Sequence, residues 1–408
     1  MMQYTLKNAD IVHAKGPEAK GSVSVNGSKL TIPGSSTKEF DLKGASYIYP
    51  ALVNIHDHMR GNYLPRVGPN GDLYYVNWSY WDADLKSSPV YQERANITID
   101  QMYALSAYKN LFSGVATVND HFPHEINSPF IPVLPIRVIE AYTLAHECSS
   151  YDLKWGDGME IEHARAVKKN WPFITHLEEG FDPEAQDGIG ILERAGCLDD
   201  HDVFIHCIGF SDEDIAKTAK AKASIAWCPA SNIFMFNATC KIKKILAAGI
   251  NVAIGTDSTH TGSANLLEEM RFARQTYQKL YSEDLPAKDL FPMVTINPAK
   301  AFRMADSIGS LETGKNADIM VMKAVTENPY ENLAGARMED IELLTVDGVP
   351  VLAERRFADL LPDEGKGYEE ILSGGRQVLV KGNPATLYKA IREAVGFKKT
   401  LDYLPFEP

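Results

Sequence analysis

The sequence predicts an α/β fold in which parallel strands alternate with helices. From about residue 170 the chain repeats a short apolar run, a loop and a helix-forming stretch, which is the pattern of βα units. Several of the apolar runs end directly in histidine or aspartate, and enzymes place such residues at the carboxyl ends of parallel strands. A length of 408 residues suffices for one large barrel with a smaller attached domain.

The two flanks of the βα region are predicted to be rich in β-structure. Residues 1–49 and 308–365 contain short alternating runs that are separated by turn residues. We therefore expect the flanks to pair as a small composite β-sandwich, with residues 50–307 forming a distorted (β/α)8 TIM-like barrel. Residues 366–408 form a C-terminal extension whose placement stays open, with a predicted strand at Gln377–Val380 and a predicted helix at Pro384–Val395.

The elements of the βα region follow in order along the chain. Ser211 is a predicted helix N-cap, because three acidic residues follow it directly. Between residues 121 and 176 only Ile136–Leu144 has the pattern of a strand, so the third or fourth unit is either compressed or lacks its helix. The other predicted strands are Pro172–Thr175, Asp202–Ile205, Ala223–Trp227 and Ile250–Ile254, and the predicted helices are Pro183–Gly196, residues 241–248 and residues 263–281.

Composition narrows the classes of function. The net charge of −13 argues against a nucleic-acid partner, since no surplus of basic residues exists to neutralise phosphates. No secretory signal and no apolar stretch long enough for a membrane span is found. The five cysteines are scattered without a C-x-x-C pair, which indicates reduced thiols in a cytoplasmic protein, and Cys207 is expected to be a small buried filler.

Histidine and aspartate side chains follow four of the predicted strands. Residues 50–58 read P-A-L-V-N-I-H-D-H, so His56 and His58 lie on the same face of a strand and Asp57 on the other. His176, His206 and Asp257 each follow a later apolar run. Each of these residues alone has a structural alternative: a buried histidine is often a core residue, and Asp257 could cap the next helix. Together they predict a divalent metal site at the mouth of the barrel.

Two carboxylates follow His176 in the sequence H-L-E-E. Glu179 lies past the predicted strand end and could act as a proton shuttle beside the metal site. Glu178 is the competing carboxylate, with a solvated loop acid as its alternative reading.

These motifs resemble the amidohydrolase superfamily, in the branch of cytosine, guanine and S-adenosylhomocysteine deaminases and triazine hydrolases. The matching segments occur in the family's order and span most of residues 45–355. They are P-A-L-V-N-I-H-D-H at 50–58, H-L-E-E at 176–179, I-H-C at 205–207, C-P-A-S-N at 228–232, G-T-D-S at 255–258, T-I-N-P-A-K-A at 295–301 and G-S-L-E-T-G-K-N-A-D-I-M-V-M at 309–322.

The resemblance implies roles for the site residues. His56, His58, His176 and Asp257 would bind one divalent metal ion, with zinc as the first choice and iron(II) or manganese as alternatives. Glu179 would be the general acid/base, His206 would bind or polarise the substrate, and Asp257 would also accept a proton from water. Two-metal members of the superfamily need a bridging lysine or acid on the fourth strand, for which Lys154 is the one weak candidate, so one ion is expected.

Further residues are candidates for contacting the substrate. Trp78, Tyr80 and Trp81 belong to a segment, Asp72–Leu85, that would overhang the mouth of the barrel and either stack on a planar ring or simply pack on the barrel. Three more candidates have a structural alternative each: His121 as a histidine bonded to the backbone, His260 as a loop histidine in solvent, and Arg60 in a salt bridge at the rim.

We therefore predict a metal-dependent hydrolase that acts on carbon–nitrogen bonds of a small molecule, with hydrolytic deamination of a nitrogen heterocycle as the favoured reaction. Ring opening of a cyclic amide or amidine, and dechlorination, are alternatives that use the same attack by hydroxide. A non-catalytic scaffold on the same fold is the alternative from another class. A homo-oligomer is suggested by the resemblance alone.

Overall fold

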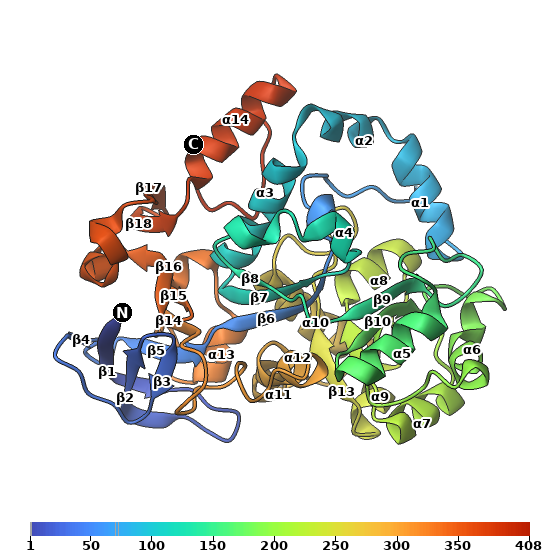
Figure 1. Ribbon diagram of the computed structural model, residues 1–408, viewed down its shortest axis with the longest axis horizontal. Helices are drawn as coiled ribbons and strands as arrows, with labels where there is room; N and C mark the ends of the chain where they lie inside the picture. The colour runs from blue at the N-terminus through green and yellow to red at the C-terminus, as the bar shows by residue number, and fades with distance from the viewer. Residues whose placement is uncertain (1, 70, 72) are drawn as a thin grey trace.

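The computed structural model describes residues 2–69, 71 and 73–408, and it combines parallel sheets, a mixed sheet and surrounding helices (Figure 1). The fold belongs to the predicted α/β class. Among the described residues, no helix is both long and apolar enough to cross a membrane.

Parallel strands form two sheets at the centre of the molecule. One sheet has five strands in the order β13-β12-β11-β10-β9, and the other has three in the order β6-β7-β8. Nearly all of their residues are buried, as expected for strands covered on both faces. The strands are β6 (Leu52–Asp57), β7 (Val115–Asp120), β8 (Arg137–Val138), β9 (Thr143–Glu147), β10 (Phe173–Leu177), β11 (Asp202–His206), β12 (Ser224–Trp227) and β13 (Asn251–Ile254).

The two parallel sheets are not joined into one closed ladder within the described residues. Several hydrogen bonds connect them near the carboxyl ends of their strands. The Asp257 amide donates to the His56 carbonyl at 3.1 Å, and the His121 ring lies 3.2 Å from the Ala145 carbonyl oxygen. Both seams therefore meet where the predicted site residues lie.

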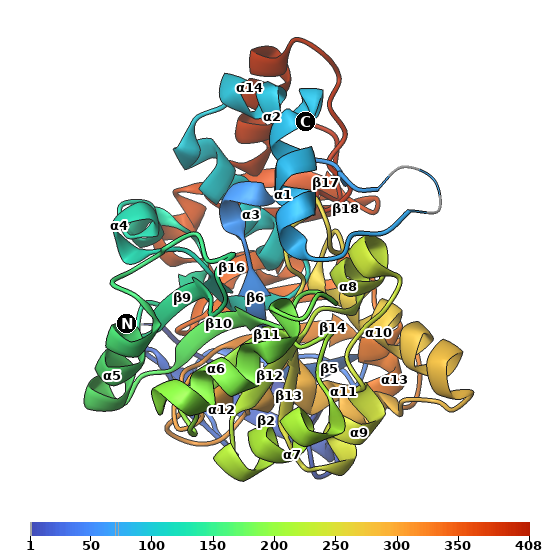
Figure 2. The ribbon, with the colours of Figure 1, turned by 90° about the vertical axis from the view of Figure 1, so that its right-hand side faces the viewer.

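Helices follow most of the parallel strands, and α5, α6 and α7 cover the outer face of the five-stranded sheet (Figure 2). The predicted Ser211 cap is confirmed, since its hydroxyl accepts from the Asp214 amide. The C-P-A-S-N motif begins a helix itself, which the sequence analysis did not anticipate. The helices are α3 (Ile99–Phe112), α4 (His124–Asn127), α5 (Met159–Lys169), α6 (Gly188–Ala195), α7 (Asp212–Ala221), α8 (Pro229–Phe236), α9 (Ile242–Ala247), α10 (Leu266–Tyr281), α11 (Ala287–Met293) and α12 (Ile296–Ala301).

The short region between residues 121 and 176 lacks one helix, as expected from its length. The predicted strand Ile136–Leu144 is two strands, β8 and β9, and residues 139–142 between them contain no helix. A four-residue link is too short for a helical crossover. The chain therefore passes directly from the three-stranded sheet to the five-stranded one.

Strands from both ends of the chain form one mixed sheet of ten strands (Figure 1). Its N- and C-terminal parts meet where β5 pairs antiparallel with β14, for example Ile48 with Val321. One face packs around a core of its own that includes Leu6, Val25 and Leu343. The strands are β1 (Gln3–Ile11), β2 (Glu18–Asn26), β3 (Lys29–Thr31), β4 (Glu39–Asp41), β5 (Ser46–Pro50), β14 (Ile319–Lys323), β15 (Ile341–Val346), β16 (Val349–Glu354), β17 (Tyr368–Ser373) and β18 (Arg376–Lys381).

The C-terminal extension, residues 366–408, packs against the mixed sheet and helix α3. Its predicted strand and helix are both present, as β18 and as α14 (Pro384–Val395), and the extension adds β17 and β18 to the mixed sheet. Helix α14 packs beside α3, and the last residues return to the core. There the Tyr403 hydroxyl donates to the Asn62 carbonyl at 2.6 Å, and the Phe406 ring lies 5.6 Å from that of Phe112.

A buried lysine on α3 ties the ends of β6 and β13 together. The Lys109 ammonium lies 3.1 Å from both carboxylate oxygens of Asp57. It is also 2.9 Å from the Asn62 side-chain oxygen, 3.0 Å from the Thr256 hydroxyl and 3.0 Å from the Asp257 carbonyl. The Lys109 and Asp57 side chains are 1% and 0% exposed. Because a buried charge is costly unless paired and hydrogen-bonded, this set of contacts holds both strand ends in one arrangement.

We predict that Lys109→Met lowers the free energy of unfolding by roughly 3–5 kcal/mol, because it leaves the Asp57 carboxylate buried without a counter-charge. Urea unfolding followed by circular dichroism measures the change. Combining it with Asp57→Asn should restore part of the loss.

Lys244→Met is the matched control, since the Lys244 ammonium pairs with Asp212 on an exposed surface. Exposed pairs of this kind contribute little to stability. A Lys109→Met protein as stable as this control would contradict a structural role for the buried pair.

Candidate active site

The carboxyl ends of four parallel strands bring the predicted site residues together. The imidazole Nε2 atoms of His58 and His176 lie 3.3 Å apart. The nearer Asp257 carboxylate oxygen is 3.8 Å from His56 Nε2 and 3.9 Å from His58 Nε2. The donor atoms of His56, His206 and Asp257 also lie within 4.8 Å of one another. Residues as far apart in the chain as His56 and Asp257 thus lie within one small space.

The donor atoms fit a bound divalent cation. Ligand atoms around a tetrahedral zinc ion, with bonds of about 2.0–2.1 Å, lie about 3.3 Å apart. His56 is fully buried, yet neither of its ring nitrogens has a hydrogen-bond partner among the described residues. Burial and the neighbouring histidine rings lower the pKa of His56 and His176 well below the usual value, which favours the neutral form that a metal ligand needs.

Backbone and side-chain contacts fix the orientation of these groups. His176 Nδ1 lies 2.7 Å from the His146 carbonyl oxygen, so this nitrogen carries the proton and Nε2 faces the other rings. One carboxylate oxygen of Asp257 accepts from the Ser231 hydroxyl at 2.7 Å and from the Thr261 hydroxyl at 2.9 Å. Helix α10 is capped by Asn265. The alternative in which Asp257 caps this helix is therefore wrong.

Asp257 is held as a carboxylate by its surroundings. Burial alone would raise the pKa of Asp257, but the nearby histidine rings of His58, His56 and His206 and the Ser231 hydroxyl together lower it. The backbone of Asp257 is left-handed, with φ of +53°, and His206 has φ of +69°. Such strained residues cluster at functional sites, where the surrounding structure holds them in place.

The structure separates the two neighbouring glutamates. The Glu179 carboxylate lies 3.5 Å from His206 Nε2 and is buried inside the site. The Glu178 carboxylate turns away and accepts from the Ile189 amide at 3.2 Å. Glu178 is buried as well, so its reading as a solvated loop acid is wrong. On the other side of His206, Nδ1 lies 2.8 Å from the Asn232 side-chain oxygen, which leaves Nε2 to face Glu179.

A pocket of about 280 Å³ opens beside this cluster. His58 and three tryptophans, Trp78, Trp81 and Trp155, are among the residues that line it. Trp78 and Trp81 come from α1 (Trp78–Ser87), which forms a helix where an overhanging loop was expected; residue 72 of that segment lies outside the described residues. Tyr80 is 60% exposed and does not line the pocket. The lining residues are His58, Arg60, Gly61, Trp78, Trp81, Asp82, Leu85, Lys86, Tyr91, Arg94, Phe122, His146, Leu153, Trp155 and His260.

Three further histidines surround the cluster. The His121 ring stacks on that of His176 at 4.6 Å, but its Nε2 is bonded to the backbone. His260 is 6% exposed and lies 5.0 Å from the Trp81 ring, so the expectation of a loop histidine in solvent is wrong. His146 lines the pocket against Trp78 and was not predicted, although the apolar run before it resembles the other strand ends.

Two remaining residues from the sequence analysis, Lys154 and Cys207, have no ligand role in the part of the chain that the structure describes. Lys154 is exposed on a loop after β9. Cys207 is fully buried, in agreement with its predicted role as a filler, and no cysteine forms a disulfide.

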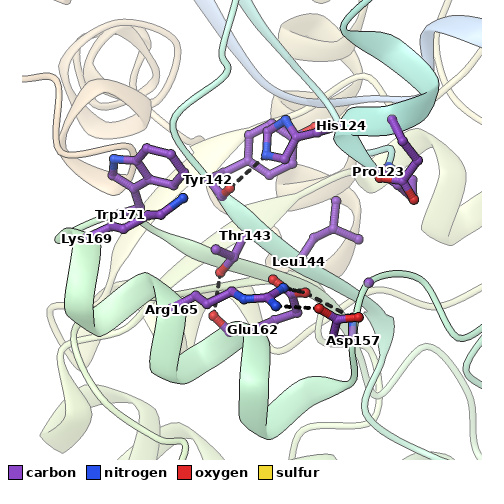
Figure 3. Close-up of a pocket in the computed structure, with 12 residues that line it drawn as sticks. Pro123, His124, Tyr142, Thr143, Leu144, Asp157, Glu162, Arg165, Lys169 and Trp171 are labelled. Carbon is purple, nitrogen blue, oxygen red and sulfur yellow. Dashed lines mark hydrogen bonds and ion pairs between the residues drawn. The ribbon is translucent and has the colours of Figure 1, made fainter.

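A second pocket, of about 340 Å³, is larger, but its central charged groups are already paired with one another (Figure 3). Arg165 pairs there with Asp157 and with Glu162, and the Thr143 hydroxyl donates to the Glu162 carbonyl at 2.8 Å. The charged groups drawn at its centre thus bind one another. The smaller pocket beside the histidine cluster is the better candidate for an active site.

The chain is similar in sequence to curated deaminases and hydrolases. A 5-methylthioadenosine/S-adenosylhomocysteine deaminase from Pyrococcus abyssi (strain GE5 / Orsay) is 34% identical over 246 residues, or 57% of this chain and 55% of that protein. An S-triazine hydrolase from Gordonia rubripertincta is 30% identical over 51% of this chain and 47% of that protein. The chain spans about half the length of several such relatives.

The fold of the chain is also similar to that of a solved structure. An adenosine deaminase from Xanthomonas campestris with bound zinc superposes with a TM-score of 0.75, at 16% identity, over 96% of this chain and 98% of that one. The model of the amidohydrolase family matches residues 138–352, which is more than half of the chain. As its motifs predicted, the chain belongs to the amidohydrolase family.

Proposed function

We propose that this protein is a metal-dependent hydrolase whose main reaction is the hydrolytic deamination of a nitrogen heterocycle. The observation that carries the proposal is the set of donor atoms from His56, His58, His176 and Asp257, which are buried or partly buried and lie close together at one end of the parallel strands. A non-catalytic scaffold has no use for such a set with a buried acid, Glu179, beside it.

These four residues would hold one divalent ion, with zinc as the first choice and iron(II) or manganese as alternatives. A bound ion of this kind lowers the pKa of a coordinated water from 15.7 to about 7. A single ion fits the residues better than two, because β9 contains no lysine. Its one acid, Glu147, accepts hydrogen bonds from the Trp78 indole at 2.9 Å and from the Ser149 hydroxyl at 2.8 Å.

The chain's own residues would divide the proton transfers. Asp257 would accept a proton from the attacking water, since its carboxylate is held in one orientation by Ser231 and Thr261. Glu179 would protonate the leaving nitrogen, so that ammonia or an amine departs. His206 would hydrogen-bond the substrate, because Asn232 fixes its ring with Nε2 toward Glu179.

The finer architecture belongs to the same proposal. The five-stranded and three-stranded sheets would together form a distorted (β/α)8 barrel at residues 50–307. The mixed sheet, with its separate core, would form a composite β-sandwich from residues 1–49 and 308–365. The bonds across both seams of the parallel sheets support this partition, as does the likeness in fold to the zinc-bound adenosine deaminase.

Deamination is favoured by the deaminases among the relatives and by aromatic walls suited to a flat ring. Ring opening or another displacement on a ring, as the triazine hydrolase relative suggests, is the second candidate. Ammonia release, measured across a panel of amino-substituted pyrimidines, purines and pterins, separates the two. Hydrolysis of ring amides or chlorinated triazines without ammonia release would favour the second candidate.

We predict that Glu179→Gln retains the metal but lowers kcat by roughly 10²–10⁴-fold, because glutamine cannot transfer the proton. Steady-state ammonia release on the best substrate of the panel measures the effect. Glu178→Gln is the matched control, since the carboxylate of Glu178 points away from the site. Similar activities for the two variants would show that the acid is misassigned.

Metal content gives an independent prediction. His176→Ala should bind the ion at least roughly tenfold more weakly, because it removes a donor atom from the cluster. Elemental analysis after dialysis measures the metal content. His124→Ala should retain the metal, as its ring is bonded to the Tyr142 carbonyl outside the cluster. Full metal content in the His176 variant would exclude that residue as a ligand.

A further inference from the structure

Two arginines in the wall of the pocket, Arg60 and Arg94, have no acidic partner in the part of the chain that the structure describes. Among the described residues, the Arg60 guanidinium forms neither a hydrogen bond nor an ion pair, and its Nε is buried without any acceptor. The guanidinium carbon lies 5.6 Å from the centroid of the Phe122 ring. A guanidinium has five N–H donors and is always charged, so leaving it partly buried without an acceptor is costly.

Arg94 lies beside Arg60 and adds a second positive charge. Its guanidinium donates to the Tyr91 hydroxyl at 2.9 Å and to the backbone carbonyl of Arg60 at 3.4 Å, and no carboxylate of the described residues lies within 4 Å of it. Burial and the charge on Arg60 together lower the pKa of Arg94. The fold thus holds two like charges close together in a pocket.

The acidic side chains near these arginines interact with other groups of the protein. Asp82, in the same pocket, pairs with Lys86 at 2.5 Å. Glu93 pairs with Lys399 at 3.0 Å. Asp120 accepts from the Met59 amide at 2.9 Å. In a chain with a net charge of −13, two adjacent arginines without an acidic partner among the described residues indicate that an anion from outside completes the site.

We propose that Arg60 and Arg94 bind an oxyanion group of the substrate, so that the enzyme acts on a small nitrogen heterocycle bearing a carboxylate or a phosphate. This inference rests on the proposed function, because His58 lies in the wall of the same pocket and one ligand could contact both ends. A volume of about 280 Å³ is small for a ligand pocket and suits a single or fused ring. Trp81, Trp155 and Phe122 supply aromatic faces for the ring.

Binding of a matched pair of ring compounds tests the proposal without any turnover. Nicotinate and nicotinamide have the same shape but differ in the charge of one substituent. Calorimetry and the quenching of tryptophan fluorescence report binding, since three tryptophans line the pocket. We expect the metal-loaded wild-type protein to bind nicotinate roughly tenfold to a hundredfold more tightly than nicotinamide.

Variants show whether the arginines cause this preference. In Arg60→Met and Arg94→Met, which keep the apolar stem, the ratio of the two dissociation constants should fall toward one. Arg60→Lys should restore only part of it, because lysine lacks the planar fork. Arg66→Met is the control and should keep the full ratio, since that guanidinium is bonded to the Gly262 carbonyl outside this pocket. Metal content is measured in each variant.

Competition identifies the oxyanion. Displacement of nicotinate by acetate but not by inorganic phosphate would indicate a carboxylate, and the reverse a phosphate. Equal binding of the two ring compounds, or no binding of either, overturns the proposal. So does a preference that survives in both methionine variants, because the carboxylate would then be bound by the metal. Failure of the deamination panel alone leaves these binding results unaffected and contradicts only the proposed reaction.

Discussion

The geometry of the site depends on one buried ion pair, between Lys109 and Asp57. The pair joins helix α3 to the end of β6, and the further contacts of the ammonium with Thr256 and the Asp257 carbonyl extend it to the end of β13. Side chains alternate along a strand, so fixing Asp57 on one face of β6 directs His56 and His58 to the other. The pair thus places two imidazoles from one strand opposite a carboxylate from another, without itself taking part in the chemistry.

The surroundings of the site leave its groups in different charge states. Burial favours neutral imidazoles at His56 and His176, whereas the nearby rings keep Asp257 ionised. Burial acts in the opposite sense on Glu179, where it raises the pKa well above the usual value, and the charges of Asp257 and Glu147 act in the same direction. Opposite pKa shifts of two carboxyl groups in one site support the proposed division, in which Asp257 would accept a proton and Glu179 would donate one.

The sequence was most informative where a residue's role follows from local pattern. The strand ends at His58, His176 and Asp257 could be predicted because apolar runs and polar ends are local features. Lys109 could not, since its partners lie up to 148 positions away and a lysine within a helix normally faces solvent. His146 was missed because the short strand β8 disturbed the pattern before it. The burial of His260 and the missing partner of Arg60 are properties of the packed structure, and no motif records them.

The histidine cluster and the adjoining pocket each contain an unsatisfied group, and both groups affect stability. The ring nitrogens of His56 and the Nε of Arg60 are buried without a hydrogen-bond partner among the described residues, which costs free energy in the folded state. If stability were the only requirement, apolar residues of similar volume would be favoured at these positions. Their presence therefore indicates ligands that satisfy them. Since the unfolded chain does not assemble either set, binding of a cation and of an anion would each stabilise the native fold. The buried pair of Lys109 and Asp57 stabilises the strand ends around the site, and this offsets the free energy lost by burying the unsatisfied groups. The stability of the fold and its capacity to bind ligands are therefore linked.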